Sequence, residues 1–132
     1  MTDALVWVDD VDPDAANQTT LSGVAAARGV ATGIARVLQS SDELHRLAPG
    51  EILVCESTSP NWTPAFGKIA AAVCDGGGML SHAAIVGREY GVPTVTAAGV
   101  ATLAIGDGDE IEVDGTNGRV TILKRAAELA SA

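Results

Sequence analysis

The sequence predicts a single domain of the α/β class, and three observations support this. The chain has 132 residues, of which 47% are hydrophobic, enough to build one buried core. An apolar run at 68–74 leads through three glycines into an Ala-rich segment ended by Gly91 and Pro93, which is typical of a strand, a loop and a helix. Residues 110–123 alternate polar and apolar around the turn at 115–118, which predicts an antiparallel hairpin.

Composition narrows the classes of partner. The formal net charge of −9 argues against binding to nucleic acid or to an anionic membrane, because both carry negative charge. No apolar run is long enough for a transmembrane helix, and the start of the chain lacks the pattern of a signal peptide. We therefore expect a cytoplasmic protein.

The chain divides into three parts. Residues 1–20 are acidic and lack hydrophobic periodicity beyond their first half, which predicts a flexible, solvated segment. Residues 21–124 contain the predicted strands and helices and form the folded domain. Residues 125–132 are expected to form a tail or a short, frayed helix.

Local signals place the remaining elements before the glycines. A first long strand is expected at 32–38 and a second at 51–56. Between them, a short helix should begin after Ser40, with Glu43 completing a capping box on that serine. A further short helix at 64–69 is predicted because a threonine at its N-cap, Thr63, precedes a proline.

Beyond the glycines, 94–96 is expected to form a short buried strand and 100–105 a helical turn. Cys55 and Cys74 lie in apolar runs without metal-ligand spacing, so we interpret them as reduced core residues. The acidic residues at 106–109 are interpreted as turn residues, and no metal site is predicted.

His82 is the candidate catalytic residue. It lies in the first turn of the helix that follows Gly76, Gly77 and Gly78. A helix N-terminus attracts anions and disfavours an imidazolium, so this position should keep the ring neutral and bring phosphate close. Glycines let the backbone approach phosphate without a Cβ in the way. The pattern therefore favours a histidine that accepts a phosphoryl group.

The run Gly77-Gly78-x-x-Ser81-His82-Ala83-Ala84-Ile85-Val86-x-Arg88-Glu89, followed by Gly91-Val92-Pro93, resembles the phosphohistidine signature of the phosphoenolpyruvate-utilising enzymes. These include phosphoenolpyruvate synthase, pyruvate phosphate dikinase, enzyme I of the sugar phosphotransferase system, phenylphosphate synthase and rifampin phosphotransferase. Two positions depart from the pattern: Leu80 stands where many members have threonine, and Gly87 where alanine or serine is usual. The resemblance extends from about 23 to 123 and implies a swivelling β/β/α phosphohistidine domain.

The resemblance also implies roles for individual residues. His82 would be the phosphorylated residue. Beside it, Gly77 and Gly78 would let the backbone come close to phosphate, and Ser81, as the N-cap, would either orient the loop or donate to phosphate. Thr63, in a segment that also resembles the synthase and rifampin phosphotransferase branches, could donate to a phosphoryl oxygen, or its aromatic neighbours could simply anchor the loop to the core. Arg88 is either a phosphate or partner contact or a surface ion pair.

The chain has no phosphate-binding P-loop and no room for an ATP-grasp domain beside this fold. The resemblance therefore implies a carrier that is not active alone. It would take the β-phosphoryl group of ATP at a partner ATP-grasp subunit or domain, where ATP and Mg²⁺ bind, and pass it to a small-molecule acceptor on another subunit or domain. The chain itself would bind no cofactor. The acceptor is left open between a phenolic compound, an antibiotic and pyruvate.

Two alternatives stay open on the sequence. One is a non-catalytic interaction module of the same fold. The other is a carrier charged directly by phosphoenolpyruvate.

Overall fold

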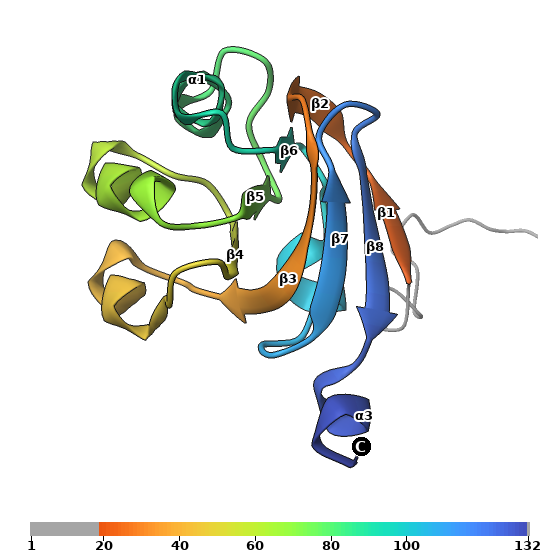
Figure 1. The fold of residues 1–132 in the computed structure, drawn as a ribbon. Coiled ribbons are helices and arrows are strands. Elements are labelled where there is room, and N and C mark those ends of the chain that lie inside the picture. The colour runs from red at the N-terminus through yellow and green to blue at the C-terminus, as the bar shows by residue number, and fades with distance from the viewer. Residues whose placement is uncertain (1–18, 132) are drawn as a thin grey trace, which may run out of the picture.

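The computed structural model describes residues 19–131, which form two layers of β-structure covered on one side by helices (Figure 1). The elements, in chain order, are β1 (Thr20–Ser22), β2 (Val24–Ala27), β3 (Val30–Val37), η3 (Ser41–Arg46), β4 (Ile52–Cys55), η4 (Pro60–Gly67), β5 (Ala71–Cys74), α1 (His82–Tyr90), β6 (Thr94–Thr96), α2 (Ala101–Ala104), β7 (Glu110–Asp114), β8 (Arg119–Lys124) and α3 (Ala126–Ser131). This arrangement confirms the predicted β/β/α class.

The predicted strands, the hairpin and the helical turn at 100–105 are present, with boundaries shifted by up to three residues. The acidic segment predicted at 1–20 lies almost entirely outside the described residues. The part predicted as a tail or short helix contains α3. Within residues 19–131, no helix has the length and apolar character needed to cross a membrane.

Strand β3 belongs to both layers. Its first half, 30–34, pairs antiparallel with β7, which in turn pairs with β8. Its second half, 35–37, pairs parallel with β4, and the parallel order continues through β5 to β6. A long strand that changes partners along its length joins the antiparallel layer to the parallel layer, and Figure 1 shows it bending between them.

Strands β1 and β2 close the sheet at its two ends. β1 pairs with β8 and β2 pairs with β6, although only Gly23 separates them in the chain. The amide of Gly23 donates to the carbonyl of Gly118 at 2.8 Å. A Cβ on Gly23 would lie 2.4 Å from the backbone oxygen of Thr96, so only glycine fits at this junction. The sequence analysis did not predict either strand.

Alternating side chains of the parallel strands build two cores. In β4, Ile52 and Val54 face the antiparallel layer, whereas Leu53 and Cys55 face the helices. Both faces are buried, which explains why this strand is continuously apolar. The core that contains Leu53 and Cys55 lies under η3, η4 and α1. It supports the end of the sheet where the parallel strands finish.

The capping box predicted at Ser40 is only half formed. Ser40 Oγ accepts from the amide of Asp42, as a cap should. Glu43 Oε1 instead accepts from the amide of Gln39, one residue before the cap. The helix is a 3-10 helix, and its tighter winding moves the glutamate past the position that a capping box requires.

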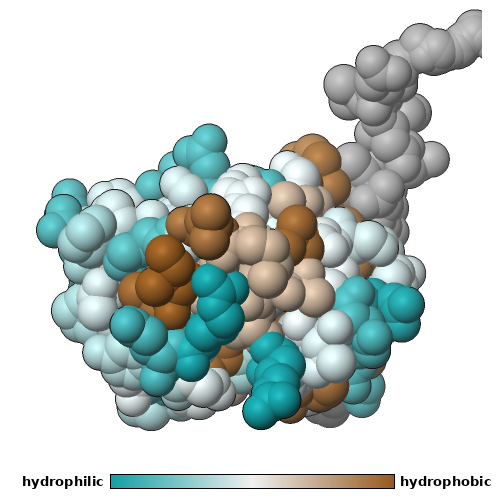
Figure 2. All heavy atoms as spheres, turned by 90° about the horizontal axis from the view of Figure 1, so that it is seen from above, coloured by the Kyte–Doolittle hydropathy of each residue, from teal (hydrophilic) through white to brown (hydrophobic). Residues whose placement is uncertain are grey.

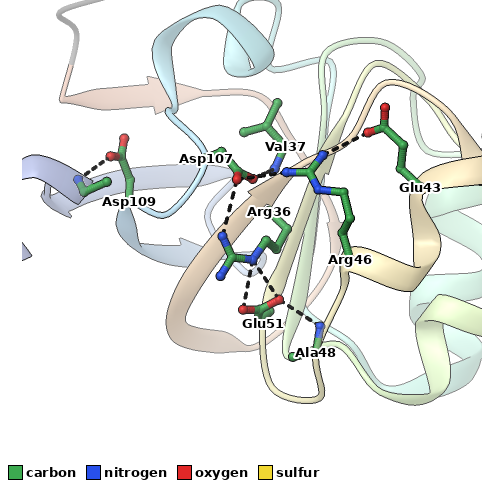
Figure 3. A network of polar contacts seen from close by, with 9 residues as sticks. Arg36, Val37, Glu43, Arg46, Ala48, Glu51, Asp107 and Asp109 are labelled. Carbon is green, nitrogen blue, oxygen red and sulfur yellow. Dashed lines mark hydrogen bonds and ion pairs between the residues drawn. The ribbon is translucent and has the colours of Figure 1, made fainter. Parts of the chain in front are cut away.

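The carboxylate of Asp107 joins three segments (Figure 3). It accepts from the amide of Val37 at 2.9 Å, from Arg46 Nη2 at 2.9 Å and from Arg36 Nη1 at 3.4 Å. Arg36 also bonds Glu51 through Nε at 3.0 Å. These side chains are partly exposed, so the network contributes modestly to stability and serves mainly to fix the end of β3.

Asp109 anchors the start of α3. Its carboxylate is 2% exposed and accepts from Arg125 Nη1 at 3.0 Å and from the amides of Gly106 and Ala126, both at 2.8 Å. Asp107 and Asp109, the acidic residues of the predicted turn, therefore both accept hydrogen bonds from backbone amides and from arginine side chains of this chain.

Candidate functional site

His82 is the first residue of α1, at the end of the loop 75–81 that follows β5. Ser81 is the N-cap, and its Oγ accepts from the amide of Ala84 at 3.3 Å. The helix ends at Gly91, whose φ of 67° lies in the left-handed region that favours glycine. The predicted position of His82 in the first turn is thus confirmed.

Two threonine hydroxyls hold the His82 ring from opposite sides. Thr58 Oγ1 lies 2.7 Å from Nδ1, and Thr63 Oγ1 lies 3.1 Å from Nε2. The ring of Phe66 meets the imidazole edge-on, with centroids 6.3 Å apart. His82 and both threonines are half-buried, so the ring is fixed in orientation but remains open to solvent on one side.

Thr63 is not the N-cap that the sequence predicted. The helix begins at Pro60, with Ser59 as its cap, and continues through Pro64 to Gly67. Pro60 also suits a first helical position, so the helix starts one turn earlier than expected. The Thr63 side chain contacts His82 Nε2, a contact that the sequence did not predict. Its expected role, donation to a phosphoryl oxygen, stays a prediction.

Thr58 is a site residue that the sequence analysis missed. It follows β4 and precedes η4, in a Ser57-Thr58-Ser59 run in which each residue is a possible hydrogen-bond donor. Nothing in the local pattern separates these three hydroxyls. Only the spatial approach of the β4 end to the start of α1 identifies Thr58 as the partner of His82.

The glycines of the loop have different roles. Gly77 has a φ of 91°, which other residues adopt only with strain, and its Cβ would also touch Ser81. A Cβ on Gly78 would meet nothing within 4 Å. The hollow beside Gly77 and Thr58 has a volume of about 20 Å³, which suits a water molecule but not a phosphoryl group. This hollow is therefore too small to hold a phosphoryl group.

Arg88 fastens the loop. Its Nη1 donates to the carbonyl of Ala26 in β2 at 2.8 Å, and its Nη2 donates to the carbonyl of Met79 at 2.7 Å. Neither of the two roles considered for it, a phosphate contact or a surface ion pair, describes these contacts. Arg88 instead connects α1, the closing strand β2 and the loop that carries His82.

Asp75 fixes the other end of the loop. Its carboxylate accepts from the amide of Thr102 at 2.9 Å and from the hydroxyl of Thr102 at 2.5 Å. The carbonyl of Asp75 also accepts from the amide of Gly99. The loop is therefore held at its start by α2 and near its end by Arg88, which leaves little freedom for the segment before His82.

Gly87, a departure from the family pattern, is explained by Thr94. A Cβ on Gly87 would lie 2.2 Å from Thr94 Oγ1, which is fully buried and held by its bond to the carbonyl of Val92. We expect Gly87→Ala to lower the free energy of unfolding by about 2 kcal/mol. Adding Thr94→Ala should recover part of that loss, because it removes the clashing oxygen. Urea denaturation of both single variants and the double variant tests this; strictly additive effects would contradict the packing explanation.

Cys55 and Cys74 are free and buried, with their sulfurs 3.9 Å apart. This confirms their interpretation as reduced core residues. The hydrogen bond to Cys74 and burial both raise the pKa of Cys55, which disfavours the reactive thiolate. We expect iodoacetamide to modify neither thiol in the folded protein at mildly alkaline pH and both thiols in denaturant. Mass spectrometry provides the readout, and rapid labelling of the folded chain would contradict this assignment.

No group of three or more metal-ligating side chains occurs in the part of the chain that the structure describes. The described contacts of His82 come from hydroxyl groups and an aromatic ring, without a lysine or arginine. The site therefore offers a fixed imidazole, two hydroxyls and a helix N-terminus. This combination suits a nucleophilic histidine better than a metal centre or a proton relay.

Comparison with known proteins agrees with this geometry. Residues 47–118 match the family model described as "PEP-utilising enzyme, mobile domain". The match covers more than half of the chain and contains His82 and both threonines. The chain therefore belongs to the mobile domains of the phosphoenolpyruvate-utilising enzymes, which are phosphohistidine domains of synthases, dikinases and phosphotransferases.

Several curated proteins are similar over most of the chain. It is 40% identical over 88% of its length to the uncharacterized phosphotransferase YvkC of Bacillus subtilis, and 42% identical over 87% to the rifampicin phosphotransferase of Streptomyces sviceus. It is 42% identical over 85% to a probable phosphoenolpyruvate synthase of Archaeoglobus fulgidus. The chain spans only 14%, 13% and 15% of these relatives, respectively.

Solved structures support the fold. A solution structure of enzyme I (nEIt) superposes with a TM-score of 0.54 at 26% identity, covering 67% of this chain and 36% of that one. Aconitase X of Thermococcus kodakaraensis superposes with a TM-score of 0.62 at 18% identity, covering 81% of this chain and 100% of that one. The second likeness concerns the fold alone.

Proposed function

We propose that this chain is the phosphoryl carrier of an ATP-dependent phosphotransferase, with His82 Nε2 as the atom that carries the phosphoryl group. The observation that supports this most is the placement of one threonine hydroxyl at each ring nitrogen. This arrangement fixes the orientation of the ring and gives each ring nitrogen a polar partner. Each hydroxyl is able to donate or to accept, so the tautomer with its lone pair on Nε2 is part of the proposal.

The two hydroxyls suit opposite roles. A neutral imidazole has one N–H donor and one lone pair. If Nδ1–H donates to Thr58, the closer hydroxyl, the lone pair lies on Nε2 and accepts from Thr63. The Nε2 lone pair then attacks phosphorus, while the Nδ1 proton stays on the ring and remains bonded to Thr58. The Thr63 hydroxyl is released and donates to a phosphoryl oxygen.

The donor we propose is ATP bound with Mg²⁺ on a partner ATP-grasp domain. The β-phosphoryl group ends on Nε2, and ATP and one water molecule yield AMP and phosphate. This chain contributes the nucleophile and its orientation, and the partner contributes nucleotide binding. The small share of each relative that the chain spans supports a division of labour among domains.

The carrier then moves to an acceptor site, where an oxygen of the acceptor attacks phosphorus and the P–Nε2 bond breaks. The names of the relatives support two acceptor classes, an antibiotic such as rifampicin and pyruvate. A phenolic compound is the third acceptor that we propose, on the family resemblance alone. The proposal applies to all three, because the acceptor does not have to contact this chain beyond the phosphoryl group itself.

A chimera tests the proposal. The complete chain replaces the mobile domain of the Streptomyces sviceus rifampicin phosphotransferase, and the purified protein is incubated with ATP labelled at its β-phosphorus. We expect one acid-labile labelled phosphoryl group on the chimera and none on its His82→Ala variant.

His45 supplies the matched control. His45 is exposed, and its Nδ1 lies 3.1 Å from the carbonyl oxygen of Asp42 in the same short helix. The His45→Ala chimera should be labelled like the unchanged one. Labelling that survives in His82→Ala, or that is lost in His45→Ala, would show that the phosphoryl group is carried elsewhere.

A further inference from the structure

Four large apolar side chains are exposed around His82. Leu80 is 85% exposed, Met79 51%, Tyr90 50% and Ile85 42%. We call these four residues the apolar rim. Figure 2 shows hydrophobic side chains gathered on the face that carries α1. Exposed apolar residues that occur singly need no explanation, but a group beside a candidate nucleophile indicates an interaction surface.

The rim is positioned next to the imidazole from both sides. Leu80 precedes His82 by two residues in the loop, and Ile85 follows it by three in α1, which places Ile85 on the same side of the helix. Tyr90 lies against Phe66, with ring centroids 6.4 Å apart, and Phe66 touches the imidazole. A domain that docks over the start of α1 and its exposed side would therefore meet these side chains.

Leu80 is presented by a braced turn. The amide and the hydroxyl of Ser81 both donate to the carbonyl of Gly78, at 3.3 and 2.9 Å. Arg88 holds the carbonyl of Met79. Because the turn is fixed before any partner binds, docking of Leu80 costs less conformational entropy than docking of a mobile loop.

The charges around the ring indicate what the partner must bring. Within residues 19–131, the contacts of His82 include no cationic group, and the guanidinium of Arg88 is bonded to two carbonyls. The chain as a whole carries a formal charge of −9. A phosphoryl group arriving at Nε2 therefore finds its negative charge unneutralised by this chain, so the cations must come from the partner.

We propose that the apolar rim docks into an apolar socket on the phosphoryl-donor domain, with Leu80 as the anchor, and that cationic groups of that domain surround the socket and neutralise the phosphoryl group. The inference rests on the proposed function and specifies the chemistry of its partner. In this inference, apolar contacts of this chain provide recognition, and cationic groups of the donor domain neutralise the charge of the phosphoryl group.

Two phosphoryl donors, phosphoramidate and ATP, distinguish an effect on docking to the donor domain from an effect on the reactivity of His82. Phosphoramidate is small and needs no socket: the Nε2 lone pair attacks its phosphorus, the P–N bond breaks and ammonia leaves. ATP reaches His82 only through the donor domain of the chimera described above. We expect Leu80→Asp to slow labelling by ATP in the chimera about 30-fold or more and to leave labelling of the free chain by phosphoramidate unchanged.

Leu123 provides the matched control. It is 47% exposed on β8, well away from α1 in Figure 1. Leu123→Asp should alter neither reaction, and Leu80→Met should retain most of the ATP reaction. Thermal unfolding of each variant verifies folding.

The outcomes are distinct. No labelling of the unchanged chain by phosphoramidate would overturn the proposed function itself. Labelling by phosphoramidate together with an equal rate from ATP for Leu80→Asp and the unchanged chimera would overturn only the docking inference. An unchanged chimera that ATP cannot label would contradict the proposed ATP-dependent function and the docking inference together. A dimer of the unchanged chain that Leu80→Asp dissociates would assign the rim to a second copy and also overturn the inference.

Discussion

Replacing Thr58 by valine is expected to slow phosphoryl transfer to His82 by about 10- to 100-fold while the protein stays folded. Valine keeps the shape of the side chain but removes the hydroxyl at 2.7 Å from Nδ1. In the function proposed above, the ring then loses the contact that keeps its proton on Nδ1. Thr63 is able to accept from Nε2–H instead, which occupies the attacking nitrogen with a proton. Initial rates with phosphoramidate measure the effect without any partner.

Thr58→Ser is the control, because it retains the hydroxyl. It should transfer phosphate at close to the rate of the unchanged chain. Nitrogen NMR of the imidazole adds a readout that a packing defect would not change: the fraction of the ring protonated on Nδ1 should fall in Thr58→Val and persist in Thr58→Ser. Equal rates and equal tautomer fractions in all three proteins would contradict the role given to Thr58.

Gly115→Ala is expected to lower the free energy of unfolding by about 3 kcal/mol or more. A Cβ at this position would lie 1.9 Å from the carbonyl oxygen of Ala27 and 2.9 Å from the amide nitrogen of Thr94. Both are backbone atoms, one in β2 and the other in β6, so no flexible side chain is able to move aside. The amide of Gly115 also donates to the carbonyl of Gly29 at 2.8 Å, which fixes the turn in this position. Urea denaturation measures the loss.

Gly78→Ala is the matched control for stability. Its added Cβ would meet no atom within 4 Å, and its φ is outside the left-handed region. The midpoint of unfolding should barely change. A Gly115→Ala protein as stable as Gly78→Ala would show that the turn between β7 and β8 is not held against β2 as described.

The sequence predicts the centre of the site well because the determinants are local. The order of apolar run, glycines and Ala-rich segment places His82 at a helix start, and the serine before it is the cap. Likewise, the alternation at 110–123 predicts the hairpin because a half-buried strand requires that period.

Residues that act across the fold were less predictable. Thr58 contacts His82 although 24 positions separate them, and no local pattern distinguishes it from its serine neighbours. The proline after Thr63 predicts that Thr63 is a helix N-cap, yet the helix starts at Pro60. Arg88 reaches back 62 positions to Ala26, a contact that exists only because β2 closes the sheet beside α1. Each of these depends on the packing of distant segments.

The closing strands illustrate the same limit. The segment 20–27 is Ala-rich, short and interrupted by Gly23, and its β-branched residues are only Thr20 and Val24, so it lacks the pattern that predicts a strand. This segment closes the sheet because its backbone at Gly23 lies against the backbone at Gly118. That contact depends on both edges of the sheet being present.

The most direct test of the central claim is the identity of the phosphorylated atom. The complete chain, labelled with nitrogen isotopes in its histidines, is treated with phosphoramidate and examined by phosphorus and nitrogen NMR. The account predicts one phosphorus, bonded to Nε2 of His82, with the proton retained on Nδ1. Phosphorus on Nδ1, on His45 or on neither histidine would contradict it.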